Sequence, residues 1–246
     1  MESVQLMCGI CGIVYPNNDP VDPNTLGTMC ASIAHRGPDR RGLVVLENLG
    51  LRCNRLKIIH LQNGDQPMAN EDGSVHMVMN GEIYNHPEPR KPLLAPGHTF
   101  KTLSDSETVL HGYNQWGPWI LNRLNDVFAL AIWDHKDKAL FLARDRLGLK
   151  PLYYRHKNKR FLFATEIKAI IAANHQGHGL DTTSLYDWFP FSFVPTPRTM
   201  FQAILKVPPG HWLLLKDHQI HLQQYWHISF PPAESTPSHL PLKTGV

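Results

Sequence analysis

The sequence has no long apolar run, no secretory signal and almost no excess of charge, and each absence excludes a class of protein. No apolar stretch approaches the roughly 18 residues that a membrane-spanning helix needs. The N-terminus carries Glu2 and no Lys or Arg before its apolar residues, which argues against a secretory signal. The formal net charge is only +3 and the basic residues are scattered. We therefore predict neither membrane association nor nucleic-acid binding.

Cysteine is scarce, with four residues in 246, and the four do not form a disulfide framework. Cys8 and Cys11 make a single C-x-x-C, which can be a redox pair or half of a zinc site. The thioredoxin-like redox motif also needs a βαβ setting, which is absent here. The 15 histidines include no His-Glu-x-x-His motif. We predict no metal site, and a reduced, cytoplasmic protein.

The chain is 42% hydrophobic and 18% charged, which suits one large or two small globular domains. Apolar and β-branched runs bounded by turn signals predict strands at residues 8–15, 43–46, 50–59, 75–79, 127–133, 139–143, 152–154, 161–164 and 212–215. Helical spacing predicts helices at residues 26–33, 105–116, 166–173 and 185–191, with a capping box at 104–107. The Pro-rich segment 88–98 predicts an exposed loop. This pattern favours an α+β fold with antiparallel sheets.

The pair Met7-Cys8 is the first chemical signal. A cysteine that directly follows an initiator methionine becomes the chain terminus once that methionine is trimmed. Its α-amine titrates near pH ~8 and can accept the thiol proton, so one residue serves as nucleophile and base. Residues 1–6 stand before Met7 as the sequence is written. We therefore expect residues 1–7 to be an extension, either upstream of the true start or a leader that is removed.

Four further side chains carry both a functional and a purely structural interpretation. Asn80-Gly81 offers two donors for an oxyanion, or is simply a hairpin turn. Arg55 clamps a carboxylate, or is an exposed arginine of an edge strand. Glu82 and Asp105 receive an ammonium group, or cap a helix. Together they suit recognition of a free α-amino acid.

Several motifs in order resemble one family. They are Met-Cys-Gly-Ile-x-Gly (7–12), His-Arg-Gly-Pro-Asp (35–39), Asn-Gly-Glu-Ile-Tyr-Asn-His (80–86), Ser-Asp-Ser-Glu (104–107), Arg-Asp-Arg-Leu-Gly-Leu-Lys-Pro-Leu-Tyr-Tyr (144–154) and Ala-Thr-Glu-Ile-Lys-Ala (164–169). The set resembles the class II glutamine amidotransferase domain of glutamine-hydrolysing asparagine synthetases. The His-Arg-Gly-Pro-Asp motif favours that branch over the phosphoribosyl-pyrophosphate and glucosamine-phosphate branches.

The resemblance implies a four-layer αββα sandwich of the Ntn hydrolase type. It also implies that glutamine is hydrolysed to glutamate and ammonia through a γ-glutamyl thioester, with the ammonia used to convert aspartate to asparagine. By position, the nucleophile and the oxyanion hole would be Cys8, Asn80 and Gly81. The glutamine pocket would comprise Arg55, Leu56, Lys57, Ile58, Ile59, Asn80, Gly81, Glu82 and Asp105, with Arg55 on the α-carboxylate, and Glu82 and Asp105 on the α-amine.

The sequence departs from the family in three ways. Cys53 stands where members usually have His, and His60 where they usually have Asp, so we expect altered packing or affinity beside the pocket. The Ser-Gly-Gly-x-Asp-Ser loop, which binds nucleotide phosphates in the synthetase domain, is absent. ATP and Mg are therefore expected only in a synthetase domain that this sequence lacks, and no cofactor is expected here.

The motifs also suggest a division of the chain. We expect an amidotransferase domain at 8–180, a bridging segment at 181–230 and a Pro/Ser-rich tail at 231–246. The expected partners are glutamine as substrate, and a separate synthetase chain or a second copy of this chain. The alternative hypothesis is a non-catalytic fragment that acts as a glutamine-binding or partner-docking module.

Overall fold

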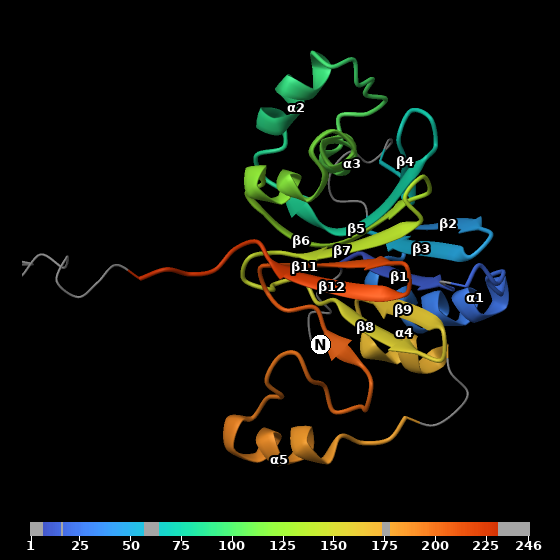
Figure 1. Cartoon of the computed structure of the whole chain (residues 1–246), viewed down its shortest axis with the longest axis vertical. Helices are drawn as coiled ribbons and strands as arrows, with labels where there is room; N and C mark the ends of the chain where they lie inside the picture. Colours follow the sequence, from blue (N-terminus) through green and yellow to red (C-terminus); the bar gives the residue numbers. More distant parts are fainter. Residues whose placement is uncertain (1–6, 16, 57–63, 174–177, 231–246) are drawn as a thin grey trace, which may run out of the picture.

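Two six-stranded antiparallel sheets face each other in the computed structural model, which describes residues 7–15, 17–56, 64–173 and 178–230 (Figure 1). The first sheet has the order β10 (Leu205–Lys206), β8 (Tyr153–Lys157), β9 (Arg160–Ala164), β1 (Gly9–Val14), β3 (Leu49–Arg55) and β2 (Arg40–Leu46). The second has the order β12 (Gln219–Gln224), β11 (His211–Lys216), β7 (Ala139–Arg144), β6 (Asp126–Asp134), β5 (Val75–Ile83) and β4 (Met68–Ala69).

Helices cover the outer faces of the two sheets (Figure 1). On the first sheet lie α1 (Pro23–Ser32), the short turn η1 (Ala34–Arg36) and α4 (Ile167–Ala172). On the second lie α3 (Asp105–Trp116) and η2 (Gly117–Arg123), and α2 (Pro87–Leu94) packs on α3. The predicted α+β fold, an αββα sandwich of antiparallel sheets, is confirmed.

Strand β1 shows why the sequence folds in layers. All of its residues are buried, and they alternate between two apolar cores. Ile10 and Val14 belong to the core between the sheets, whereas Cys11 and Ile13 pack under α1 and α4. A strand covered on both faces requires a continuous apolar run, which residues 8–15 provide.

Side-chain caps fix where α1 and α3 begin. The Asp22 carboxylate accepts hydrogen bonds from the backbone N–H groups of Asn24 and Thr25 at the start of α1. The Ser104 hydroxyl accepts from the N–H of Glu107 at 3.2 Å, so this half of the predicted capping box is present. Glu107 itself accepts from the N–H groups of Lys101 and Thr102 instead of closing the box.

The loop predicted at 88–98 is wrong in part, and so is one of the two interpretations of Asn80-Gly81. Asn80-Gly81 is not a hairpin turn, because β5 continues to Ile83 and these residues pair with Ala129 and Phe128 of β6. The loop predicted at 88–98 is helical over its first part, where α2 runs from Pro87 to Leu94. Proline at the first helical position lacks only an N–H that would be unpaired there, and buried Leu93 anchors the helix.

The sheets continue past residue 180, where the amidotransferase domain was expected to end. Strands β10, β11 and β12 complete the outer edges of both sheets, and β11 pairs with β7 from Trp212 to Leu215. Helix α5 (Thr182–Phe191) lies apart from the sandwich at the lower end of Figure 1. None of the helices in the described part of the chain has the length and apolar character that a bilayer crossing demands.

Candidate active site

A cavity opens between the start of β1 and the edge of β5, and it gathers the residues that the sequence singled out. It is lined by Met7, Cys8, Arg55, Leu56, Gly64, Gln66, Met79, Asn80, Gly81, Glu82, Ser104, Asp105, Ser106 and Lys150. Every predicted site residue in the described part of the chain lines this cavity. Lys57, Ile58 and Ile59 lie outside the described residues, as does His60.

The Cys8 thiol is a half-buried group held against the end of β3. Its Sγ accepts a hydrogen bond from the Leu56 N–H at 3.4 Å and lies 3.6 Å from the Leu56 carbonyl oxygen. A hydrogen bond from the Cys53 thiol lowers the pKa of Cys8 to about 7, aided by the Leu56 N–H and by the Arg55 and Arg36 guanidinium groups and opposed by burial. A substantial fraction of Cys8 is therefore thiolate at neutral pH.

The backbone of Cys8 is positioned by two residues that sequence reasoning did not assign to the site. Arg36 Nε donates to the Cys8 carbonyl oxygen at 3.2 Å, and its Nη1 lies 2.9 Å from Glu166 Oε1. Arg36 is 8% exposed, so this ion pair is largely shielded from water. The sequence did contain a signal for both residues, since Arg36 belongs to the His-Arg-Gly-Pro-Asp motif and Glu166 to the Ala-Thr-Glu-Ile-Lys-Ala motif.

Two hydrogen-bond donors face the cavity from β5. Asn80 is 1% exposed and its Nδ2 has no hydrogen-bond partner within the described structure. The N–H groups on either side of Gly81 along the same strand edge are occupied, because Met79 donates to Gln66 Oε1 and Ile83 to Asp105 Oδ2. Alternate N–H groups of a strand point to the same edge. The Gly81 N–H therefore points to the cavity, not to β6.

Only glycine fits at position 81. A Cβ there would lie 2.2 Å from the Val127 carbonyl oxygen and 2.6 Å from Phe128 Cα, both backbone atoms of β6. The close approach of two backbones thus explains Gly81, in place of the turn that the Asn-Gly pair suggested.

Charged groups of both signs lie within the cavity wall. Arg55 is 7% exposed and its Nη1 lies 3.2 Å from Asp65 Oδ1, while Asp65 also pairs with Arg40. Asp105, also 7% exposed, accepts from the N–H groups of Ile83 and Ser106 and pairs with no cation among the described residues. Glu82 stands half-buried beside it on β5. A guanidinium and two carboxylates in one cavity suit an amino acid, which carries a carboxylate and an ammonium group.

Hydrogen bonds between side chains and backbone groups shape the long motif at 144–154 into a loop beside the cavity. Arg144 donates to the carbonyl oxygens of Lys150 and Gly148. Asp145 is 1% exposed and accepts from the N–H groups of Leu147, Leu149 and Lys150. The resulting loop carries Lys150 to the cavity rim, where its Nζ lies 3.3 Å from Met7 Sδ.

The cavity thus combines an acidified thiol, two donors and charges of both signs, which is chemistry suited to acyl transfer from an amide. Among the described residues, the one cluster with metal-ligand chemistry lies elsewhere, around His111.

Comparison with known proteins agrees with this geometry. A family model described as glutamine amidotransferase domain matches residues 7–226. Asparagine synthetase 1 (glutamine-hydrolyzing) of Bacillus subtilis (strain 168) is 36% identical over 233 residues, which are 93% of this chain and 37% of that protein. Amidase chyE of Penicillium rubens is 37% identical over 201 residues, which are 81% of this chain and 29% of that protein.

The fold is also found among solved structures. A glutamine phosphoribosylpyrophosphate amidotransferase from B. subtilis superposes with a TM-score of 0.65 at 19% identity, covering 89% of this chain and 49% of that chain. At this identity the likeness concerns the fold alone. The chain spans only 37% and 29% of the lengths of the two curated relatives.

Proposed function

Because the chain belongs to the family of glutamine amidotransferase domains, we propose that it hydrolyses glutamine to glutamate and ammonia at the Cys8 cavity. The observation that carries the proposal is the pair of donors beside the thiol: the buried, unpartnered Nδ2 of Asn80 and the Gly81 N–H. A thiol nucleophile next to two preorganised donors is the arrangement that acyl transfer requires.

The reaction begins when the Cys8 thiolate attacks the side-chain carboxamide carbon of glutamine. The former carbonyl oxygen becomes an oxyanion that accepts from Asn80 Nδ2 and the Gly81 N–H. The carbon–nitrogen bond then breaks, the nitrogen takes a proton and leaves as ammonia, and a γ-glutamyl thioester remains on Cys8. Water adds to the thioester carbonyl, glutamate is released and the thiol is regenerated. In this proposal the α-amine of Cys8 accepts and returns the protons, so the active chain begins at Cys8.

The charged residues that line the cavity determine which substrate is accepted. Arg55 binds the α-carboxylate of glutamine, while Asp105 and Glu82 bind its α-ammonium group. Leu56 and the segment 57–59 would complete this pocket. The step uses no cofactor, and because it needs a reduced thiol we place the protein in the cytoplasm.

The ammonia acceptor is a second part of the proposal. The Bacillus relative is named an asparagine synthetase (glutamine-hydrolyzing), which supports asparagine synthesis as the use of the ammonia. In this proposal aspartate is the acceptor, and the ATP and Mg of that reaction bind outside the amidotransferase domain. The acceptor reaction would then occur in a synthetase unit outside the amidotransferase domain, and a separate synthetase chain is one arrangement we consider. A dimer of this chain is the other arrangement we consider.

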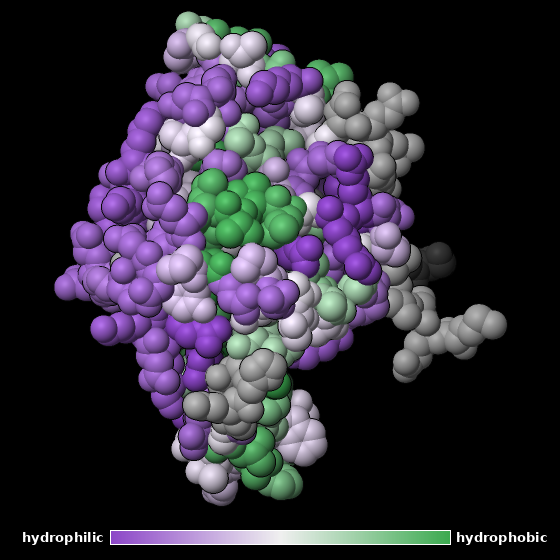
Figure 2. Space-filling view, turned by 90° about the vertical axis from the view of Figure 1, so that its right-hand side faces the viewer, coloured by the Kyte–Doolittle hydropathy of each residue, from purple (hydrophilic) through white to green (hydrophobic). Residues whose placement is uncertain are grey.

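Helix α5 supports docking of such a partner. Its apolar side chains are unusually exposed, including Tyr186 at 76% and Phe189 at 72%. Figure 2 shows apolar side chains at the lower end of the molecule, where α5 lies in Figure 1. An apolar patch of this kind is typical of an interaction surface. It also favours the second candidate function, a non-catalytic docking module.

The decisive experiment compares two forms of the chain, one that starts at Met1 and one that starts at Cys8. We expect glutamate release from glutamine only for the form with a free Cys8 amine. Circular dichroism checks that both are folded, and mass spectrometry of the mature protein identifies its first residue. A folded chain that starts at Cys8 and releases no glutamate would leave the docking module as the better explanation.

A further inference from the structure

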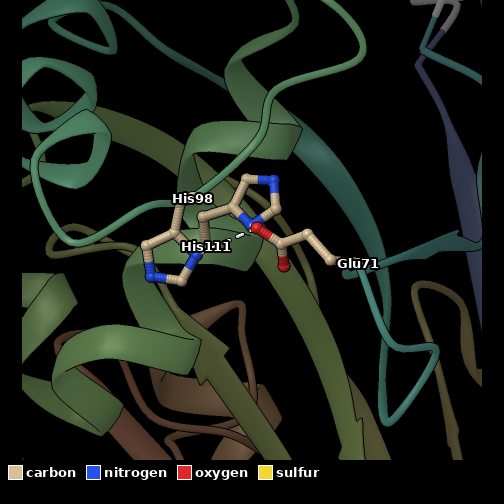
Figure 3. A group of neighbouring side chains, drawn as sticks. All are labelled: Glu71, His98 and His111. Carbon is tan, nitrogen blue, oxygen red and sulfur yellow. Dashed lines mark hydrogen bonds and ion pairs between the residues drawn. The ribbon is translucent and has the colours of Figure 1, made fainter.

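Three side chains from separate segments meet on the outer side of the second sheet, away from the Cys8 cavity. Glu71 lies in the turn between β4 and β5, His98 in the loop after α2, and His111 on α3. Figure 3 shows them together, with the Glu71 carboxylate against an imidazole nitrogen. One ligand atom from each lies within 4.8 Å of the others.

Two distances between these atoms are close to those between ligands of a tetrahedral metal site. His98 Nδ1 lies 3.1 Å from Glu71 Oε1, and His111 Nδ1 lies 3.3 Å from the same oxygen. Nitrogen and oxygen ligands about 2.0–2.2 Å from a tetrahedral zinc ion are separated from each other by about 3.3 Å. The two measured separations are therefore compatible with a metal ion bound to all three groups.

The surroundings orient both imidazole rings. His111 Nε2 lies 3.7 Å from Glu107 Oε1, and His98 Nε2 lies 3.2 Å from Gln115 Oε1. With Nε2 directed at these oxygens, each ring presents its Nδ1 to Glu71, and an imidazole can bind a metal through that nitrogen. Metal-binding histidines are characteristically oriented in this way, with the second nitrogen directed to a carboxylate or another oxygen acceptor.

Two imidazole nitrogens therefore converge on one carboxylate oxygen, and a cation bound between them stabilises that arrangement. His111 is 2% exposed, and its Nδ1 makes no hydrogen bond of acceptable geometry in the described structure. A divalent metal satisfies all three groups at once.

We propose that Glu71, His98 and His111 bind a zinc ion, with a water molecule as the fourth ligand. Two imidazoles and a carboxylate are the ligands that zinc prefers. The carboxylate is itself oriented, because Glu71 Oε1 accepts from the Thr99 N–H at 3.0 Å. Sequence reasoning predicted no metal site because the three ligands lie in separate segments and form no recognisable motif.

The ion would clamp the 70–74 turn and the loop after α2 onto α3. Helix α3 begins at Asp105, a wall residue of the Cys8 cavity, and His111 lies nearly two turns farther along. The side chain of Glu71 keeps 33% exposure, which provides the path by which a metal enters. The role is structural, so zinc raises the thermal midpoint of unfolding and performs no chemistry.

The test uses the full chain, stripped with a chelator and dialysed. Zinc titration followed by calorimetry should give one ion per chain, and Zn²⁺ should raise the thermal midpoint. Glu71→Gln and His98→Gln should each weaken zinc binding at least tenfold, because each removes a ligand. His221→Gln, which removes an exposed histidine of β12, is the matched control and should bind zinc like the unmodified chain.

Co²⁺ as a spectroscopic substitute distinguishes this site from the cysteines. Nitrogen and oxygen ligands give weak visible bands without the intense near-ultraviolet absorption of a cobalt–thiolate bond. Zinc binding that survives in both Glu71→Gln and His98→Gln, or a thiolate band with Co²⁺, would overturn the proposal. Absence of stoichiometric zinc would do the same, and would identify the cluster as a proton-sharing network.

Discussion

The first sheet carries two thiol pairs on its opposite faces, and their chemistry is nearly the same. Cys8 interacts with Cys53 on the face toward the second sheet, and Cys30 of α1 interacts with Cys11 on the face toward the helices. In each pair a hydrogen bond from the partner thiol lowers the pKa of one cysteine to about 7, that of Cys8 or Cys30. The partner's pKa is raised well above its ordinary value.

Side chains along β3 alternate between the two faces of the sheet, so each cysteine pair has an arginine of β3 as a neighbour. Cys53 and Arg55 point to one face, and Arg52 and Asn54 to the other. The Arg55 guanidinium helps to lower the pKa of Cys8, as the Arg52 guanidinium does for Cys30. A lowered thiol pKa therefore does not by itself identify a nucleophile.

The two cysteine pairs differ in the accessibility of the thiol and in the hydrogen bonding of the nearby asparagine side chain. Cys30 is 2% exposed, and it exchanges hydrogen bonds with both ends of the Asn54 amide, at 2.9 and 2.8 Å. Cys8 lines a cavity in which Asn80 keeps an unpartnered Nδ2. The reaction centre at Cys8 therefore differs from the buried Cys11–Cys30 pair in having an accessible thiol and a free hydrogen-bond donor nearby. The acidity of the thiol does not distinguish the two pairs.

The largest expected effect comes from removing each thiol in turn. In the chain that starts at Cys8, the Cys8→Ala change should lower glutamate release by at least about 10³-fold, since the thioester cannot form. Cys30→Ala should leave the rate near that of the unmodified chain, provided circular dichroism shows it folded. Equal losses of glutamate release in the two variants would contradict the assignment of Cys8, and not Cys30, as the nucleophile.

Next come the two asparagines. Asn80→Ala should lower kcat by about 10²–10³ with little change in the binding of glutamine, because its donor acts on the oxyanion. Asn54→Ala should instead reduce stability by about 1–3 kcal/mol through lost buried hydrogen bonds. Steady-state kinetics and urea unfolding of both variants check this contrast. An Asn80→Ala enzyme with unchanged kcat would remove this residue from the oxyanion hole.

The two arginines should differ in substrate binding. Arg55→Lys should raise the KM for glutamine by about 10–100-fold, because a lysine cannot make two parallel hydrogen bonds to the α-carboxylate. Arg52→Lys, on the helix side of β3, should leave KM unchanged. Initial rates over a range of glutamine concentrations measure both. A similar rise in the two variants would point to damage to β3 in place of lost recognition.

These comparisons also show what the sequence could and could not predict. Strands such as β1, β6 and β7 were predictable because their apolar runs are bounded by clear turn signals. Local preference favoured a turn at Asn80-Gly81 as one of its two interpretations, yet pairing of β5 with β6 over nine positions overrides that preference. Strands β4 and β10, with two residues each, carry no recognisable pattern.

The site residues could be predicted where family motifs include them. They could not be predicted where strand register or long-range contacts determine which side chains meet. The residue types at Cys8, Arg55, Asn80, Gly81, Glu82 and Asp105 could be named, and the structure places all six around one cavity. That Cys53 faces Cys8 follows only from the pairing of β1 with β3, in which Ile10 lies opposite Cys53. The anchoring of Cys8 by Arg36 and Glu166 depends likewise on long-range contacts.

The smallest expected effect concerns Cys53 and distinguishes its thiol from that of Cys11. Cys53→Ala removes the hydrogen bond that most lowers the pKa of Cys8, so this pKa should rise from about 7 toward an ordinary thiol value. The thiolate fraction at pH 7 then falls, by up to tenfold for each unit of rise, and the difference disappears at high pH, where both forms are ionised. Rates of Cys8 alkylation against pH measure the inflection, with modification sites assigned by mass spectrometry. Cys11→Ala should leave the inflection at the pH of the unmodified chain. If the inflection does not move in Cys53→Ala either, the Leu56 N–H and the arginines are sufficient to keep the pKa of Cys8 low.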